Sequence, residues 1–254
     1  MVATGAGFQP VRNVETIAED ISTAVRRAHA ERRPVVVNVP LNIEWEEVEY
    51  EARPPLNAPA SRLAPDPDQL ETALGIIASS ARPIILAGRG AVKSDARDAL
   101  VRLGEALGAP LATSLLGTGY FEGEPFNLGI HGTLSHQIAG ETFAMADCLI
   151  VFGASLNFFT TDYQTLLAGK RVVHVDLNAR HIDRHVTVDA GVVGDARVVA
   201  ETMIEMLSEA EHQPSSFRTA DLEQRLHDFD LSEAFDDKSY DGAVDPRTLT
   251  RQLD

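Results

Sequence analysis

The chain has 254 residues, of which 44% are hydrophobic and 24% are charged, so it can build a sizeable aliphatic core. Its formal net charge of −16 argues against nucleic acid as a partner, because so acidic a surface repels phosphates. The single cysteine, Cys148, excludes an intramolecular disulfide, and the absence of a long apolar run and of a signal peptide predicts a cytoplasmic protein without a membrane partner.

The first 45 residues predict one helix and one strand. Apolar residues recur at helical spacing from Val14 to Ala28, and Asn13 can cap the first turn. The run 35–39 lies between two prolines and is apolar on both faces, which is typical of an interior strand of a parallel sheet. The preceding 33 residues predict no neighbouring strand, so we expect residues 1–45 to be the end of a domain that begins elsewhere.

A proline-rich stretch over residues 46–67 predicts an extended linker, after which residues 68–210 alternate helices with short apolar strands. Such alternation favours right-handed crossovers and a Rossmann-like parallel sheet with helices on both faces, so the fold class is α/β. The expected helices cover residues 68–79, 96–107, 137–145 and the segment after Asp195; the expected strands cover 83–87, 110–113, 148–152, 171–176 and, more weakly, 186–193.

Two stretches give weaker signals. Residues 114–135 are rich in glycine and predict an irregular segment. Residues 211–254 are polar and lack periodicity until Asp245-Pro246-Arg247, which is typical of a helix start with an aspartate cap and proline in the first turn. We therefore expect a second linker and the start of a further domain in this last segment.

Candidate ligand-binding residues lie where the predicted strands end, because open parallel sheets bind ligands beyond their carboxyl ends. Glycine lets a backbone approach a phosphate, and a carboxylate can accept hydrogen bonds from a ribose. Lys93 stands in place of the third glycine of the dinucleotide fingerprint, so tight strand-to-helix turns explain the pattern as well as a nucleotide site does. The candidates are Gly88-Arg89-Gly90, Thr113-Ser114, Gly153-Ala154-Ser155, Asp176 and Gly194-Asp195.

Other reactive side chains favour structural roles. His181 and His185 are four residues apart, but no zincin-type glutamate accompanies them, so surface or helix-capping histidines are the better interpretation of all eight histidines. Cys148 opens an entirely apolar strand, which predicts a buried, inert thiol. Phe158 and Phe159 could flank a flat ring, although an apolar pair packed beneath a loop needs no ligand.

A series of segments resembles, in order and spacing, the central domain of thiamine diphosphate-dependent enzymes, the superfamily of acetolactate synthase and benzoylformate decarboxylase. Residues 33–41 resemble the last strand of the pyrimidine-binding domain, and residues 245–247 resemble the entry to the diphosphate-binding domain. The segments that resemble the central domain are 81–90, 108–114, 128–132, 146–154, 173–178 and 193–196.

This resemblance implies a lyase or transferase that uses thiamine diphosphate and Mg²⁺ to decarboxylate or ligate a small-molecule 2-oxo acid. In that family a glutamate of the pyrimidine-binding domain activates the cofactor, and a G-D-G…N segment holds the metal. Neither is recognised here, since Tyr240 precedes Asp241-Gly242. We therefore expect no catalytic residue and no metal ligand, and a central scaffold domain that is inactive alone and whose partners are the missing catalytic domains or a second copy.

In the acetolactate synthase-like members, the resemblance further implies FAD or ADP across the strand ends of the central domain. Ser155 stands where the flavin-binding relatives usually carry an arginine, which weakens anion binding and favours an empty crevice. The alternative is a stand-alone FAD- or nucleotide-binding Rossmann-like module. The residues that would line such a site are Gly88, Arg89, Gly90, Thr113, Ser114, His131, Gly153, Ala154, Asp176, Leu177, Gly194 and Asp195.

Overall fold

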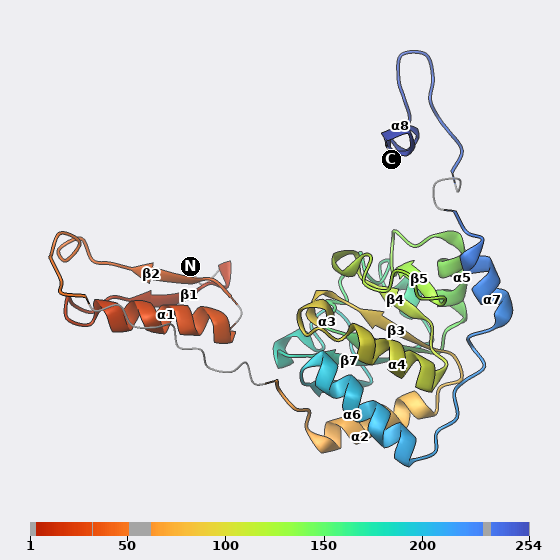
Figure 1. Ribbon diagram of the computed structural model, residues 1–254, viewed down its shortest axis with the longest axis horizontal. Helices are drawn as coiled ribbons and strands as arrows, with labels where there is room; N and C mark the ends of the chain where they lie inside the picture. Colours follow the sequence, from red (N-terminus) through yellow and green to blue (C-terminus); the bar gives the residue numbers. More distant parts are fainter. Residues whose placement is uncertain (1–3, 32, 51–61, 231–234, 254) are drawn as a thin grey trace. The chain divides into compact units, whose positions relative to one another are not determined.

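The computed structural model describes residues 4–31, 33–50, 62–230 and 235–253 (Figure 1). The chain divides into two compact units, Met1–Pro59 and Ala60–Asp254. Among the described residues, the helices are all too short or too polar to cross a membrane.

The N-terminal unit is a strand–helix–strand motif: β1 (Gly7–Pro10), α1 (Ile17–Glu31) and β2 (Val35–Asn38). β1 and β2 pair in parallel, with Gly7 opposite Val35. The prediction that nothing before the second strand supplies a neighbour was therefore wrong. β1 escaped recognition because its four residues, GFQP, begin with glycine, end with proline and include only one large apolar side chain.

The larger unit is built on a six-stranded, entirely parallel sheet in the order β5-β4-β3-β6-β7-β8. Counted from β3, this is the doubly wound order 3-2-1-4-5-6, and the chain reverses its direction across the sheet between β3 and β6. Every residue of these two central strands is buried, as their continuous apolar sequences predict. The strands are β3 (Pro83–Ala87), β4 (Leu111–Thr113), β5 (Asn127–Ile130), β6 (Cys148–Phe152), β7 (Arg171–Asp176) and β8 (Ala190–Val193).

Helices cover both faces of this sheet, as predicted (Figure 1). One core lies beneath α2, α4 and α6, whose leucines, alanines and Met203 pack on Ile85, Ile150 and Val173. The other lies beneath α5 and α7, where Phe143 and Leu222 pack with Leu86, Val151 and Val172. The helices are α2 (Pro67–Ala78), α3 (Arg89–Lys93), α4 (Arg97–Leu107), α5 (Gln137–Met145), α6 (Ala196–Glu209), α7 (Ala220–His227) and α8 (Pro246–Leu253), with 3₁₀ turns at Leu115–Gly117, Thr165–Leu167 and Ala179–His181.

In the larger unit, the structure corrects the predicted elements at four places. A short helix, α3, follows Gly88 where only a glycine turn was expected. The stretch predicted to be irregular contains β5, a strand of four residues with Gly129 in a left-handed conformation. α7 lies in the C-terminal segment, for which the sequence predicts no periodic structure before Asp245. The helix has a weak apolar pattern because it buries only one residue, Leu222. β8 begins at residue 190 rather than 186.

Candidate functional site

The loops after β3 and β6 touch backbone to backbone at the point where the strand order reverses. The Gly88 N–H donates to the Phe152 carbonyl at 2.9 Å, and the Gly90 N–H donates to the Gly153 carbonyl at 2.9 Å. A Cβ on Gly88 would lie 2.4 Å from the Gly153 carbonyl oxygen, and one on Gly90 would lie 2.6 Å from the Gly153 Cα. Close packing of the two loops therefore explains these glycines without any ligand.

The loops after β5 and β6 also meet, although β4 and β3 lie between their strands. The Thr133 N–H donates to the Phe159 carbonyl at 3.0 Å, and His131 Nδ1 donates to the Thr160 carbonyl at 2.7 Å. The His131 N–H in turn donates to the Thr113 carbonyl at 2.8 Å. These hydrogen bonds pass over the carboxyl ends of β4 and β3, which lie between β5 and β6. Polar groups of the loops there are therefore bonded to each other within the chain.

His131 is a buried residue rather than a surface or capping one, contrary to the prediction for the histidines. Its side chain packs against Phe143 with ring centroids 4.4 Å apart, and the residue is only 1% exposed. Burial lowers its pKa to about 4, so the ring is neutral at pH 7. A buried, neutral imidazole that already donates to a backbone carbonyl is held as a structural group.

Of the other histidines, His136, His181 and His185 match the expected surface or capping roles, whereas His174 does not. His136 caps α5 by accepting from the Ala139 N–H at 3.3 Å, and His181 and His185 are exposed, as predicted. His174 on β7 is buried, and within the described part of the chain its Nε2 atom lacks a hydrogen-bond partner. Burial lowers the His174 pKa, which keeps this ring neutral as well. Its position in a strand between β-branched residues could have predicted that this side chain is buried.

The two carboxylates predicted to receive a ligand are both engaged within the chain. Asp176 Oδ1 accepts from the Asn178 N–H at 2.8 Å and lies 3.0 Å from His181 Nδ1. Asp195 is 3% exposed and caps α6 by accepting from the Arg197 N–H at 3.1 Å.

The end of the linker also lies on Asp195. Arg62 Nη1 donates to Asp195 Oδ1 at 2.9 Å, and the Asp195 N–H donates to the Leu63 carbonyl at 2.8 Å. Pro65 runs beside Gly194, whose added Cβ would lie 3.4 Å from the proline nitrogen. Arg62 is not predicted by the sequence, because an arginine at the end of a proline-rich stretch carries no local signal of its partner 133 positions away.

The remaining residues of the predicted set differ in exposure. Thr113, Ser114 and Ala154 are buried, and Leu177 is half-buried. Arg89 is exposed at the start of α3, and it takes part in none of the ion pairs formed by the described residues. Their assignment to a cofactor site stays a prediction.

Potential nucleophiles lie at both ends of β6, and two aromatic residues lie in the loop that follows it. Cys148 is fully buried, as predicted, and burial raises the pKa of its thiol to about 11. Ser155 is exposed, and its hydroxyl accepts from the Asn157 side-chain amide at 3.1 Å. Phe158 and Phe159 are 48% and 57% exposed, so the expectation that they pack beneath a loop was wrong.

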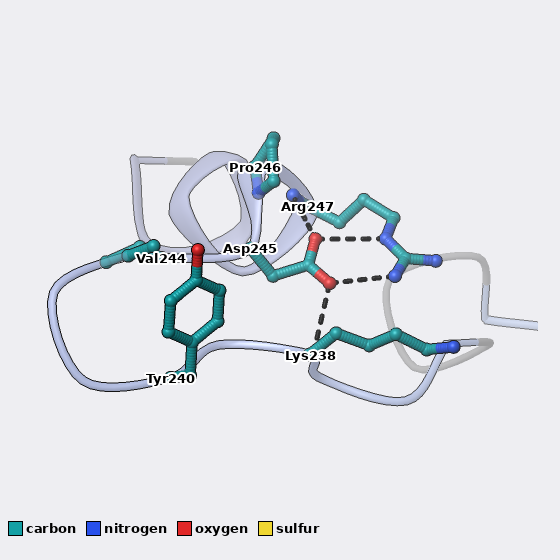
Figure 2. A pocket seen from close by; sticks show the side chains of 7 residues that line it. Lys238, Tyr240, Val244, Asp245, Pro246 and Arg247 are labelled. Carbon is teal, nitrogen blue, oxygen red and sulfur yellow. Dashed lines mark hydrogen bonds and ion pairs between the residues drawn. The ribbon is translucent and has the colours of Figure 1, made fainter.

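The C-terminal segment holds a carboxylate, Asp245, whose oxygens are fully occupied (Figure 2). Arg247 donates from Nε at 3.0 Å and from Nη2 at 2.7 Å, and the Lys238 N–H donates at 3.2 Å. This arginine holds the pKa of Asp245 well below its usual range. The carboxylate therefore caps α8 and orders the preceding turn, and no lone pair faces a metal.

The described residues offer no preformed metal site. They contain no cluster of three histidine, cysteine or carboxylate side chains able to hold a metal. The strand-end carboxylates that could hold a nucleotide ribose are instead used by His181, Arg62 and helix amides.

Comparison with known proteins supports the resemblance to thiamine diphosphate-dependent enzymes. The matched residues include every strand of the larger sheet. Residues 70–203, more than half of the chain, match the family model of the thiamine pyrophosphate enzyme central domain. The chain is 31% identical to a probable acetolactate synthase large subunit of Methanococcus aeolicus over 181 residues, covering 68% of this chain and 30% of that protein. It is 34% identical to the acetolactate synthase isozyme 3 large subunit of Escherichia coli K12, covering 58% of this chain and 26% of that protein.

A solved structure shares the fold. The benzoylformate decarboxylase of Polynucleobacter necessarius superposes with a TM-score of 0.63 at 19% identity, covering 83% of this chain and 39% of that one. The chain thus spans between about a quarter and two-fifths of the proteins it matches. A parallel sheet in doubly wound order, the ordered series of strand-end motifs and these matches agree: the chain belongs to the thiamine pyrophosphate enzymes and carries their central domain.

Proposed function

We propose that this chain provides the central domain of a thiamine diphosphate-dependent enzyme of the acetolactate synthase type, and that the domain is a scaffold for catalytic domains rather than a catalytic unit. The proposed complete enzyme decarboxylates or ligates a 2-oxo acid. The named relatives support this reaction class, since they include acetolactate synthases and a glyoxylate carboligase of Escherichia coli O157:H7 that is 28% identical over 186 residues.

The observation that carries the scaffold role is the use of the strand-end polar groups inside the chain. The amides of Gly88 and Gly90 bond to the neighbouring loop, and Asp195 caps a helix. His131 is buried and already donates to the Thr160 carbonyl, and burial lowers its pKa to about 4, so it is neutral and only a weak base near pH 7. Polar groups that are already bonded within the chain stabilise its packing, and they are not available for acid–base, nucleophilic or metal chemistry.

The same proposal extends to the segments on either side of the central sheet. Residues 1–45 would close a pyrimidine-binding domain, residues 46–67 would link it to the central domain at 68–210, and residues 211–254 would lead into a diphosphate-binding domain. The exposure of Val36 and Val37 on a strand of interior type supports the first assignment. α8, which is capped by Asp245 but buries none of its residues, supports the last.

Binding of FAD or ADP, with the chain as a self-standing nucleotide module, is the less favoured function. One oxygen of each strand-end carboxylate already accepts hydrogen bonds within the chain, and backbone contact fills the junction between β3 and β6, where a doubly wound sheet would receive a pyrophosphate. Ser155, in place of a cation, adds no attraction for phosphate.

The test is ligand binding and turnover by the purified chain, with the Escherichia coli isozyme 3 large subunit as the positive control. We expect a colourless protein, no calorimetric heat with FAD, ADP or thiamine diphosphate plus Mg²⁺, and no CO₂ release from pyruvate. Stoichiometric flavin after purification would establish the nucleotide-binding alternative. Turnover of pyruvate by the chain alone would refute the scaffold role.

A further inference from the structure

The chain after α6 runs back along the larger unit and reaches α5. We call residues 215–229 the strap. The Ser215 N–H donates to the Leu107 carbonyl at 3.0 Å, and the side chains of Phe217 and Leu222 are buried. α7 belongs to the strap and lies beside α5 (Figure 1). The strap is therefore packed on the larger unit over its whole length.

The end of the strap stacks on the residue that caps α5. The centroid of the Phe229 ring lies 4.3 Å from that of the His136 ring, and the two planes are inclined by 22°. Phe229 is half-buried, and four residues earlier Arg225 forms an ion pair with Glu141 of α5. The stack and the ion pair hold the end of the strap on α5, and the stack covers one face of the imidazole ring.

His136 can cap α5 only in its neutral form. Its Nδ1 atom accepts from the Ala139 N–H at 3.3 Å, so Nδ1 carries no proton. The other ring nitrogen lies beside Gly129, whose added Cβ would be 3.9 Å from Nε2. A proton on Nδ1 would face the Ala139 N–H as a second donor, and its charge would lie at the N-terminus of α5, where the helix dipole repels it. Protonation is therefore incompatible with the present position of the ring.

We propose that the strap is held by a pH-sensitive latch: Phe229 docks on the ring of neutral His136, and protonation of His136 releases it. One ring serves both contacts, since its Nδ1 atom caps α5 and its face receives Phe229. A ring that turns away from Ala139 therefore also loses its stack with Phe229. Release frees the end of the strap, from which the chain continues to α8. The proposal does not depend on the function proposed above.

Thermodynamic linkage gives the direction and the size of the effect. Burial lowers the pKa of His136 below its ordinary value of 6.5, and a backbone hydrogen bond with Leu128 acts in the opposite direction. Phe229 provides part of that burial because it covers one face of the ring, so the ring binds a proton more readily once the strap is released. Docking is therefore complete above about pH 6.5 and weakens as the pH falls below that value. A single proton weakens docking at most about tenfold for each pH unit.

The other ionisable groups around the latch do not explain such a response. On the elements packed against His136 and on the strap, these groups are His131, Glu141, Arg225, His227, Asp228 and Asp230. His131 has a pKa of about 4, and carboxyl groups ordinarily titrate near pH 4, well below histidine. Arginine stays charged throughout. The exposed His227 is the remaining group that titrates in the same range, so it provides the control.

The first test is a nuclear magnetic resonance titration of the full chain, with the His136 signal assigned by its loss in His136→Asn. We expect His136 to titrate below pH 6.5, and Phe229→Ala to raise its pKa toward 6.5. Phe229→Leu should raise the pKa less, and it keeps the test valid if Phe229→Ala fails to fold by circular dichroism. An unchanged pKa would overturn the proposal. A lower pKa would overturn it too, because it would show that the phenyl ring attracts protonated His136.

The second test is hydrogen exchange of the α7 amides at about pH 7.5 and about pH 5.5, corrected for the chemical exchange rate. We expect faster exchange at the lower pH, by up to about tenfold, because it lies about one pH unit below 6.5. His136→Asn, which can cap a helix but does not titrate, should abolish the change, and the control His227→Asn should preserve it. Equal exchange at both pH values, or a response that survives in His136→Asn, would contradict the latch.

Discussion

Gly153→Ala tests the backbone contact between the loops after β3 and β6. Gly153 has φ +61°, a conformation that costs an alanine about 1–2 kcal/mol. The new methyl group would also lie 2.5 Å from the Gly90 Cα and 2.7 Å from the Ala91 nitrogen, which are backbone atoms that cannot rotate away. Overpacking of this kind adds about 1–3 kcal/mol. We therefore expect the free energy of unfolding to fall by about 2–5 kcal/mol.

The assay is urea unfolding followed by far-ultraviolet circular dichroism, since Trp45, the single tryptophan, lies in the N-terminal unit. Gly169→Ala is the matched control: φ is +72° and no atom lies within 4 Å of the new methyl group, so only the conformational cost of about 1–2 kcal/mol applies. Gly75→Ala, inside α2 with open space around it, should stabilise by about 0.5–1 kcal/mol. If Gly153→Ala costs no more than Gly169→Ala, the loops are not in contact as described.

Three further outcomes follow from buried groups. Asp195→Ala removes the cap of α6 and the partner of Arg62, so urea unfolding should show a loss of about 1–2 kcal/mol, and Asp195→Asn, which keeps a capping oxygen, should lose less. The pKa of His131 is about 4 in the folded chain against 6.5 ordinarily, so the unfolded chain binds the extra proton between these values. Stability should therefore fall by up to about 3 kcal/mol as pH drops from 6.5 to 4, and His131→Asn should flatten that slope in urea titrations. Cys148 should resist a thiol reagent until the protein unfolds, and rapid labelling of the native chain would contradict its burial.

The sequence predicts the central sheet well because its central strands are short, uninterrupted runs of apolar residues. β3 and β6 have the predicted bounds, since prolines, glycines and polar residues delimit runs that are buried on both sides. β1 and β5 were missed for the opposite reason: glycine, proline and asparagine dilute their apolar pattern, and only pairing with a neighbour makes them strands.

The candidate site was harder to predict than the fold. Motifs locate the strand ends, but they do not show which polar groups the chain itself will use. Asp195 has a partner in Arg62, and His131 has one in Thr160; both contacts join loops that are distant in sequence. Phe158 and Phe159 are exposed just before a left-handed turn at residues 162–164, where the sequence has no glycine to signal it.

The central claim is that backbone groups at the carboxyl ends of the strands are hydrogen-bonded within the chain. Hydrogen exchange at the loops after β3 and β6 tests this claim most directly. The amides of Gly88, Gly90 and Gly153 donate to carbonyls of neighbouring strands and loops. We predict slow exchange at these amides in the chain alone, and no change when FAD or ADP is added. Fast exchange that becomes slow on addition of either nucleotide would contradict the account, because it would show an open site that a ligand orders.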